Sequence, residues 1–124
     1  MSRILVVDDD RDICALVRFK LEQQGHDVLV AHDGDAGLAL AIDDDPDLVV
    51  LDWMTPRRTG IEVCSALRAH ETRSRVPIIL LTAKAQEADV ERGFAAGADD
   101  YIVKPFSPRE LARRIDAVLD RSRR

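Results

Sequence analysis

The sequence contains few cysteines, no long apolar run and no stretch with the character of a signal peptide. Its two cysteines, Cys14 and Cys64, are too few for a disulfide framework and lack metal-ligand spacing, so we expect buried thiols on helix faces. The longest apolar runs have the length of a strand, which argues against a membrane span. The first residues, MSRILVV, lead directly into a predicted strand, and we therefore expect no signal peptide and a cytoplasmic protein.

The charge is unevenly distributed along the chain. The net charge is −5; residues 1–52 contain 13 acidic and 4 basic residues, whereas residues 107–124 contain 3 acidic residues and 6 arginines. The acidic first half argues against direct nucleic-acid binding by this domain, although an effector domain outside this sequence could bind DNA. We interpret the terminal RSRR as a solvated helix end, with a docking patch or the start of a linker as alternatives.

Five short apolar runs, each leading into polar residues, have the pattern of buried strands. Val, Ile and Leu follow one another in these runs instead of alternating with polar residues, which is typical of parallel strands covered on both faces. The predicted strands cover residues 4–7, 27–31, 48–51, 78–81 and 101–103.

Amphipathic segments follow each of these runs and predict helices over 12–24, 35–42, 61–68, 86–96 and from 108 onward. The apolar stripe predicted for the first helix consists of Ile13, Leu16, Val17 and Leu21. Gly25 and Gly97 are predicted stops for the first and fourth helices. The last helix has the clearest start, because Ser107 can cap it and Glu110 can complete a capping box.

The order of five strands and five helices predicts a single α/β domain over residues 1–124, because no repeat or internal linker interrupts it. Crossovers between parallel strands are right-handed, so such a chain forms a doubly wound (βα)5 three-layer sandwich with helices on both faces of the sheet. The strand order we expect is 2-1-3-4-5, the order of flavodoxin-like folds.

Polar side chains stand where four of the five predicted strands end. Asp8 and Asp9 follow the first strand, Asp52 the third, Thr82 the fourth and Lys104 the fifth. In a parallel sheet these ends share one edge, and ligands bind beyond that edge where the strand order reverses. Each residue alone could be a helix cap or a turn residue, but four such ends on one edge indicate a site.

The residue types at this edge suit phosphoryl chemistry. Clustered carboxylates repel one another unless a proton or cation intervenes, and oxygen ligands with room for water favour Mg²⁺. A cation, the Lys104 ammonium and the Thr82 hydroxyl can together neutralise and hold phosphoryl oxygens. A carboxylate can also act as a nucleophile, and Asp52 is the candidate because the third strand is central.

The chain resembles the receiver domain of two-component response regulators over nearly its whole length, and most closely receivers of the OmpR/PhoB type. The matching motifs are VVDDD, LVVLDWMTP…G, ILLTA and GADDYIVKPF, in that order. The resemblance implies that Asp52 is the phosphoacceptor, that Asp9 binds the metal directly, and that Asp8 binds it through water. It also implies that the Met54 backbone carbonyl completes the protein ligands of Mg²⁺, with Mn²⁺ as the alternative cation.

The resemblance further implies a switch. A sensor histidine kinase or a phosphotransfer protein supplies the phosphoryl group, and Lys104 contacts it on Asp52. Thr82 and Tyr101 form the switch pair, which alters the face built from the fourth helix, fifth strand and fifth helix. Such a domain catalyses its own phosphorylation and dephosphorylation, so we do not class it as a turnover enzyme.

Several positions bear on regulation. Trp53, Met54 and Lys84 are candidate modulators: we expect Trp53 to line the site, with packed core as the alternative, and Met54 with Lys84 to obstruct attacking water. The resemblance implies a homodimer through the switching face, for which the candidate interface residues are Asp99, Asp100, Glu110, Arg114 and Arg121. Two positions depart from the family pattern: Val90 replaces a usual basic residue, and Thr55 a usual Met or Leu.

Three rival functions remain to be separated from the receiver. A haloacid-dehalogenase phosphatase needs a second aspartate two residues after its nucleophile, where this chain has Met54, and its fold needs a longer chain. A flavodoxin-like FMN carrier needs a glycine- and hydroxyl-rich loop after the first strand, where this chain has DDDRD. A pseudo-receiver that binds proteins without phosphorylation is disfavoured by the complete set of polar residues.

Overall fold

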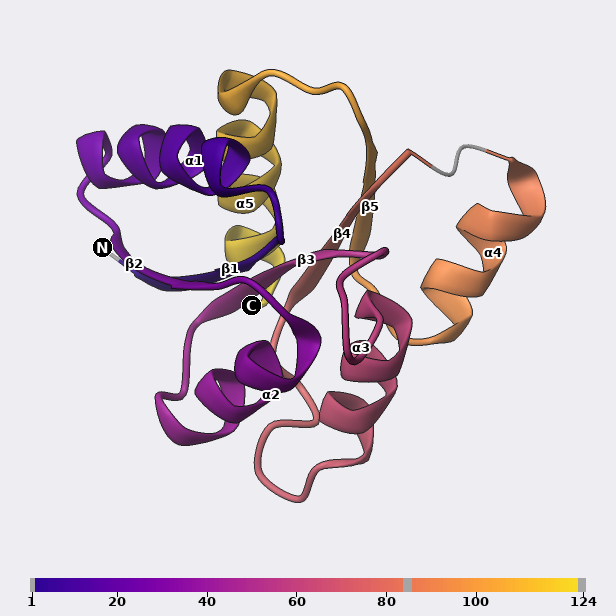
Figure 1. Cartoon of the computed structure of the whole chain (residues 1–124). Helices are drawn as coiled ribbons and strands as arrows, with labels where there is room; N and C mark the ends of the chain where they lie inside the picture. Colours follow the sequence, from indigo (N-terminus) through magenta and orange to yellow (C-terminus); the bar gives the residue numbers. More distant parts are fainter. Residues whose placement is uncertain (1, 84–85, 123–124) are drawn as a thin grey trace.

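The computed structural model describes residues 2–83 and 86–122, in which five strands alternate with five helices as the sequence predicts (Figure 1). The strands are β1 (Arg3–Val7), β2 (Asp27–Ala31), β3 (Leu48–Asp52), β4 (Ile78–Thr82) and β5 (Asp100–Val103). The helices are α1 (Arg11–Gln23), α2 (Gly34–Asp43), α3 (Gly60–Ala69), α4 (Glu87–Ala95) and α5 (Pro108–Ser122). No helix in the described part of the chain is both long and apolar enough to cross a membrane.

The strands form one parallel sheet in the order β2-β1-β3-β4-β5, which confirms the predicted topology. Val7 pairs with Leu51, and Asp52 pairs with Leu81, so the polar residues after these strands share one edge. The strand order reverses between β1 and β3, the point at which doubly wound sheets bind their ligands.

Helices cover both faces of the sheet: α1 and α5 lie on one face, and α2, α3 and α4 lie on the other (Figure 1). Alternate residues of β1 point to opposite faces, so Ile4 and Val6 pack with the first pair of helices and Leu5 and Val7 with the other three. All four are fully buried, which explains why the strands are continuously apolar.

Helix α1 corrects the predicted apolar stripe. Leu16 is 59% exposed, while Cys14, Val17 and Leu21 face the core and Ile13 packs partly against it. Cys14 and Leu16 lie on opposite sides of the stripe formed by Ile13, Val17 and Leu21, so the periodicity of the sequence is compatible with burial of either residue. Burial raises the pKa of the Cys14 thiol, as it does for Cys64, to about 11, which agrees with two inert buried thiols.

The helix ends agree with the predicted signals and add one. Gly25 and Gly97 have φ values of +88° and +110° and follow α1 and α4, as a left-handed stop residue should. The Ser107 hydroxyl accepts the Glu110 N–H at 3.0 Å, which is the serine half of the predicted capping box. A complete capping box, which the sequence analysis missed, starts α3 and is formed by Thr59 and Glu62.

Candidate functional site

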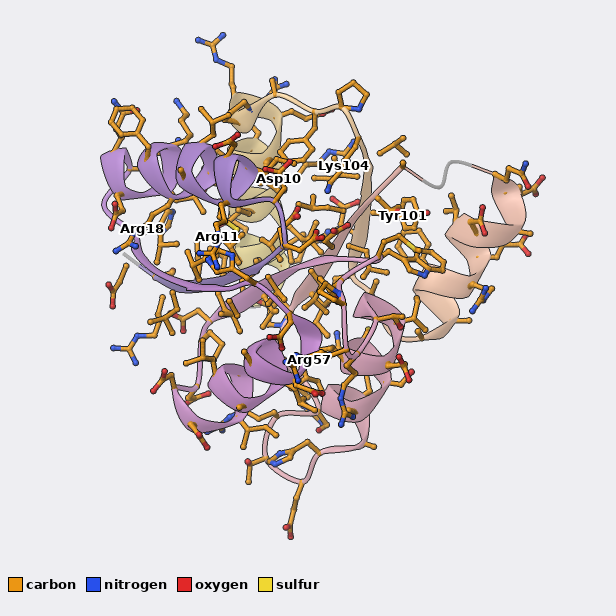
Figure 2. All side chains as sticks on the ribbon, in the orientation of Figure 1. Asp10, Arg11, Arg18, Arg57, Tyr101 and Lys104 are labelled. Atoms are coloured by element: carbon orange, nitrogen blue, oxygen red, sulfur yellow. The ribbon has the colours of Figure 1, made fainter. Side chains whose placement is uncertain are left out.

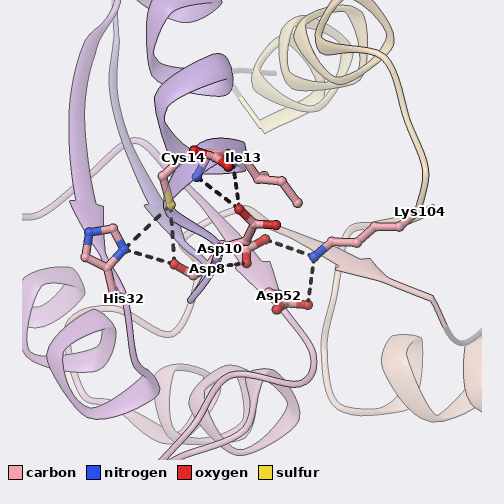
Figure 3. Close-up of polar contacts among 8 residues, drawn as sticks. Asp8, Asp10, Ile13, Cys14, His32, Asp52 and Lys104 are labelled. Carbon is pink, nitrogen blue, oxygen red and sulfur yellow. Dashed lines mark hydrogen bonds and ion pairs between the residues drawn. The ribbon is translucent and has the colours of Figure 1, made fainter.

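The carboxyl edge of the sheet brings together residues from β1, β3 and the end of β5 (Figure 3). The Lys104 Nζ lies 3.0 Å from Asp8 Oδ2 and 3.4 Å from Asp52 Oδ1. Asp8 is completely buried and Asp52 is 5% exposed, whereas Asp9 is exposed. The residues that the sequence placed at separate strand ends therefore form one charged cluster.

The electrostatics of the cluster oppose a full negative charge on Asp52. Burial first, and then the neighbouring Asp8 carboxylate, raise the pKa of Asp52, which lies at about 6 once all its neighbours are included. The Lys104 ammonium and the Met54 backbone N–H, which donates to Asp52, offset part of this effect. For Lys104, burial lowers the pKa, but the bond from Lys104 to Asp8 and the nearby carboxylates outweigh burial and raise it.

A hard cation fits this cluster. Asp8, Asp9 and Asp52 each offer a carboxylate oxygen, and these oxygens lie within 4.8 Å of one another. Two of the carboxylates are buried and share the ammonium of Lys104 within the described part of the chain, so a further positive charge would relieve their repulsion. Asp9 opens to solvent, which leaves room for the waters that Mg²⁺ retains.

Thr82 and Tyr101 lie next to the cluster and contact each other. Thr82 is fully buried at the end of β4, and its side chain hydrogen-bonds the Tyr101 phenol. Burial raises the pKa of Tyr101, which is only 8% exposed. Figure 2 shows Tyr101 on the side of the sheet that faces α4, with Lys104 at the carboxyl edge.

Trp53 lies in the packed core, which was the alternative to the prediction that it lines the site. Its indole is 4% exposed, belongs to the core on the α2–α4 face, and meets Tyr101 edge to face at 6.2 Å between ring centroids. The Arg92 guanidinium of α4 lies 5.5 Å from the indole centroid. Trp53 therefore joins the β3 end to Tyr101 and α4, with its ring in the core. The Met54 side chain, in contrast, is 61% exposed.

The other predicted positions are spread over the surface. Lys84 lies outside the described residues. Asp99 pairs with Arg68 at 2.9 Å, and Asp100 pairs with Arg114 at 3.0 Å, so both candidate interface aspartates have partners within the chain. Glu110 is partly exposed and Arg121 is exposed, both on α5. The apolar side chain of Val90 is partly buried against the core. The family pattern has a basic residue at this position.

Two residues that the sequence analysis did not assign to the site support it. The His32 Nδ1 lies 3.1 Å from the Asp8 backbone carbonyl, and the Cys14 Sγ donates to that same carbonyl at 3.3 Å (Figure 3). Together they help to hold the backbone from which the Asp8 carboxylate projects. No local pattern signals this role, because His32 follows β2 and meets Asp8 only across the sheet.

An apolar groove of about 450 Å³ adjoins the charged cluster. It lies between α1 and the segment that joins β5 to α5, and the Lys104-Pro105 peptide bond in that segment is cis. The groove is lined by Ile13, Leu16, Val17, Ala83, Lys104, Pro105, Phe106 and Pro108. Phe19, 65% exposed, continues the apolar surface along α1.

Comparison with known proteins gives one consistent result. Residues 4–116 match the family model of the response regulator receiver domain. The chain is 49% identical over 121 residues to the alkaline phosphatase synthesis transcriptional regulatory protein PhoP of Bacillus subtilis, covering 98% of this chain and 50% of that protein. It is also 49% identical over 123 residues to the transcriptional regulatory protein CpxR of Escherichia coli, covering 98% and 51%. The chain thus spans about half the length of these relatives.

Solved structures with the same fold are similar over almost their whole length. The Francisella response regulator 1452 receiver domain aligns with a TM-score of 0.91 at 35% identity. The alignment covers 98% of this chain and 99% of that domain. The chemotaxis response regulator CheY4 of Vibrio cholerae has a TM-score of 0.90 at 33% identity, with 95% and 98% covered. These similarities agree with the resemblance found in the sequence motifs.

Proposed function

Because the chain belongs to the response regulator receiver domain family, we propose that Asp52 accepts a phosphoryl group from a phosphohistidine of a sensor histidine kinase or a phosphotransfer protein. The observation that carries this proposal is the contact of the Lys104 ammonium with both Asp8 and Asp52 at the open edge of the sheet. An ammonium placed there can neutralise phosphoryl oxygens arriving beside the Asp52 carboxylate.

In the proposed reaction a carboxylate oxygen of Asp52 attacks phosphorus. A P–O bond forms, the P–N bond to the donor histidine breaks, and the imidazole nitrogen keeps the electron pair and takes up a proton. Asp52 must be ionised to attack, and a pKa of about 6 leaves most molecules ionised at pH 7. Its elevated pKa also makes Asp52 a better nucleophile than an ordinary carboxylate once it is ionised.

Mg²⁺, or Mn²⁺ in its place, would supply positive charge to the phosphoryl oxygens when bound. The groups we assign to hold it are the carboxylates of Asp8, Asp9 and Asp52, whose oxygens lie close together. The backbone carbonyl of Met54 is added because the family resemblance implies it. The contacts of Lys104 with Asp8 and Asp52 raise its pKa, so its side chain carries a positive charge at neutral pH.

We extend the proposal to a switch that runs from Thr82 to α4. A new charge on Asp52 would compete for the Thr82 hydroxyl, which hydrogen-bonds Tyr101. The Tyr101 ring packs tightly against α4, because a Cβ added at Gly93 would lie 3.0 Å from two of its ring atoms. It also lies 6.3 Å from the Phe94 ring, measured between centroids. Movement of Tyr101 would therefore change the α4–β5–α5 face.

We assign the groove beside α1 to the protein that donates the phosphoryl group. Lys104 lines this groove and also contacts Asp52, so a partner seated there would hold its phosphohistidine next to the acceptor. The exposed side chains of Leu16 and Phe19 offer it apolar contacts that the folded domain itself does not use.

The chain spans about half the length of the relatives described above, which are transcriptional regulatory proteins. We propose that phosphorylation acts through the α4–β5–α5 face on an effector domain or on a second copy of the chain. The domain itself would bind neither DNA nor membrane, would act in the cytoplasm, and would not be a turnover enzyme, since its chemistry changes only its own aspartate.

Incubation with Mg²⁺ and acetyl phosphate tests the proposal. We expect the intact mass to increase by one phosphoryl group in the wild type and to stay unchanged in Asp52→Asn, because the amide cannot form an acyl phosphate. Omission of Mg²⁺ should abolish the gain. A wild-type protein that gains no mass would point to a pseudo-receiver, and catalytic hydrolysis of a phosphate monoester would point to a phosphatase.

A further inference from the structure

We propose that Thr55 is a positioning residue for the phosphoryl site: its hydroxyl holds the loop of residues 53–59 so that Met54 faces the Asp52 carboxylate. This inference rests on the proposed function, because it assigns Thr55 to the same site. Thr55 departs from the family pattern, and the sequence alone suggests no reason for a hydroxyl there. The structure supplies one.

Thr55 is a buried polar residue with a specific partner. It is 4% exposed, and its Oγ1 donates a hydrogen bond to the backbone carbonyl of Arg58 at 2.7 Å. This bond closes the loop across three residues. The Arg58 carbonyl is partly shielded from water, so losing its donor leaves part of its desolvation cost uncompensated, and the hydroxyl is not interchangeable with a methyl group.

The segment that Thr55 closes is strained. Arg57 has a φ of +71°, and the Arg58 N–H donates to the Pro56 carbonyl at 2.8 Å, which together describe a tight three-residue turn. A non-glycine residue with positive φ is costly and persists only where the surroundings hold it. Arg57 itself is 71% exposed at its side chain and lies beside the N-terminal end of α2 (Figure 2).

Contacts from α2 hold the outer side of this turn. The Gly34 N–H donates to the Pro56 carbonyl at 3.1 Å, and a Cβ at Gly34 would overlap the Arg58 carbonyl. The Arg58 Nε lies 3.0 Å from Asp35 Oδ1. Thr55 therefore acts from inside the loop on the same carbonyl that α2 approaches from outside, and the two sets of contacts fix the turn between them.

The held loop carries the group that serves Asp52. Met54 directly precedes Thr55, and its backbone N–H donates to the Asp52 carboxylate. On the far side of the turn, the Gly60 N–H donates to the Trp53 carbonyl at 2.9 Å. A Cβ at Gly60 would lie 2.6 Å from the Asp52 carbonyl, so the two ends of the loop are pressed together. Loosening the turn would free the peptide of Met54.

Three variants test the inference: Thr55→Val, which keeps the shape and removes the hydroxyl; Thr55→Ser, which keeps the hydroxyl; and Ile115→Val, a buried α5 control away from the loop. Each variant is titrated with MgCl₂ by calorimetry under conditions in which it is folded. We expect Thr55→Val to bind Mg²⁺ about fivefold more weakly, the effect of roughly one lost hydrogen bond. Thr55→Ser and Ile115→Val should stay within about twofold of the wild type.

A second measurement needs no metal. Amide hydrogen exchange at Gly34 and Gly60, whose N–H groups bond to the loop, should be about tenfold faster in Thr55→Val than in Ile115→Val. If Thr55→Val loses stability but keeps the wild-type Mg²⁺ affinity and exchange at both amides, Thr55 only stabilises the fold and the inference is overturned. If the wild type itself does not bind Mg²⁺, the proposed function fails instead.

Discussion

Replacing Asp52 by Asn should stabilise the domain in the absence of divalent cations. The Asp52 side chain is 7% exposed, lies beside the fully buried Asp8 carboxylate, and shares the Lys104 ammonium with it. Asparagine has nearly the same shape and no charge, so it removes the repulsion and the desolvation cost of the ionised group. Lys104 keeps a partner in the variant, because its shorter contact is to Asp8.

The magnitude follows from the pKa of Asp52, which is raised from 3.8 to about 6. One pKa unit corresponds to about 1.4 kcal/mol, so the ionised carboxylate lowers the free energy of unfolding by about 2 to 3 kcal/mol. The folded state holds its proton at higher pH than the unfolded state does. The wild type therefore loses this stability as the pH rises from about 4 through 6, and the loss is complete above that range.

Urea unfolding of both proteins between pH 4 and pH 8, in the presence of a chelator, measures this difference. We expect the curves to agree near pH 4 and to separate as the pH rises, with Asp52→Asn the more stable by about 2 to 3 kcal/mol at pH 7. Added Mg²⁺ should narrow the gap by stabilising the wild type. A difference that does not change with pH, or a variant less stable than the wild type at pH 7, would refute the electrostatic argument.

Three further results are expected. Lys104→Met should leave two buried carboxylates facing each other, so urea unfolding should show the cation-free protein destabilised by about 1 to 3 kcal/mol. Acetyl phosphate should also label this variant more slowly than the wild type. Unchanged labelling would contradict the role of the ammonium. Met54→Asn should shorten the life of the acyl phosphate, because an amide can orient attacking water, whereas we expect the exposed apolar side chain of Met54 to obstruct it. Equal decay rates after removal of the donor would exclude that role. Phe19→Ala should change the free energy of unfolding by no more than about 0.5 kcal/mol, since the ring is 65% exposed. Acetyl phosphate should label the variant as it labels the wild type, but transfer from a phosphorylated donor protein should be slower. Equal transfer rates would show that this part of α1 does not contact the donor.

Residues of the site differ in how far the sequence could place them. Asp8, Asp52 and Lys104 could be assigned to one cluster because each directly follows an apolar run, and parallel strands bring such ends to a single edge. Trp53 could not be placed, because the side chain after a strand end can turn to the edge or to the core. The Thr55 hydroxyl bonds to Arg58, only three residues away, but this bond depends on a positive φ at Arg57. Arginine rarely adopts a positive φ, so the sequence does not indicate this turn.

The sequence by itself determined the order of the elements, the parallel sheet and the edge at which the charged residues meet. These features follow from local periodicity and from the chain connections that right-handed crossovers permit. Only the tertiary structure decided that Leu16 faces solvent, that Trp53 packs against Tyr101 and Arg92, and that His32 supports Asp8. Each of these depends on which neighbouring segment fills the space beside a side chain, and that is settled by packing between residues far apart in the chain.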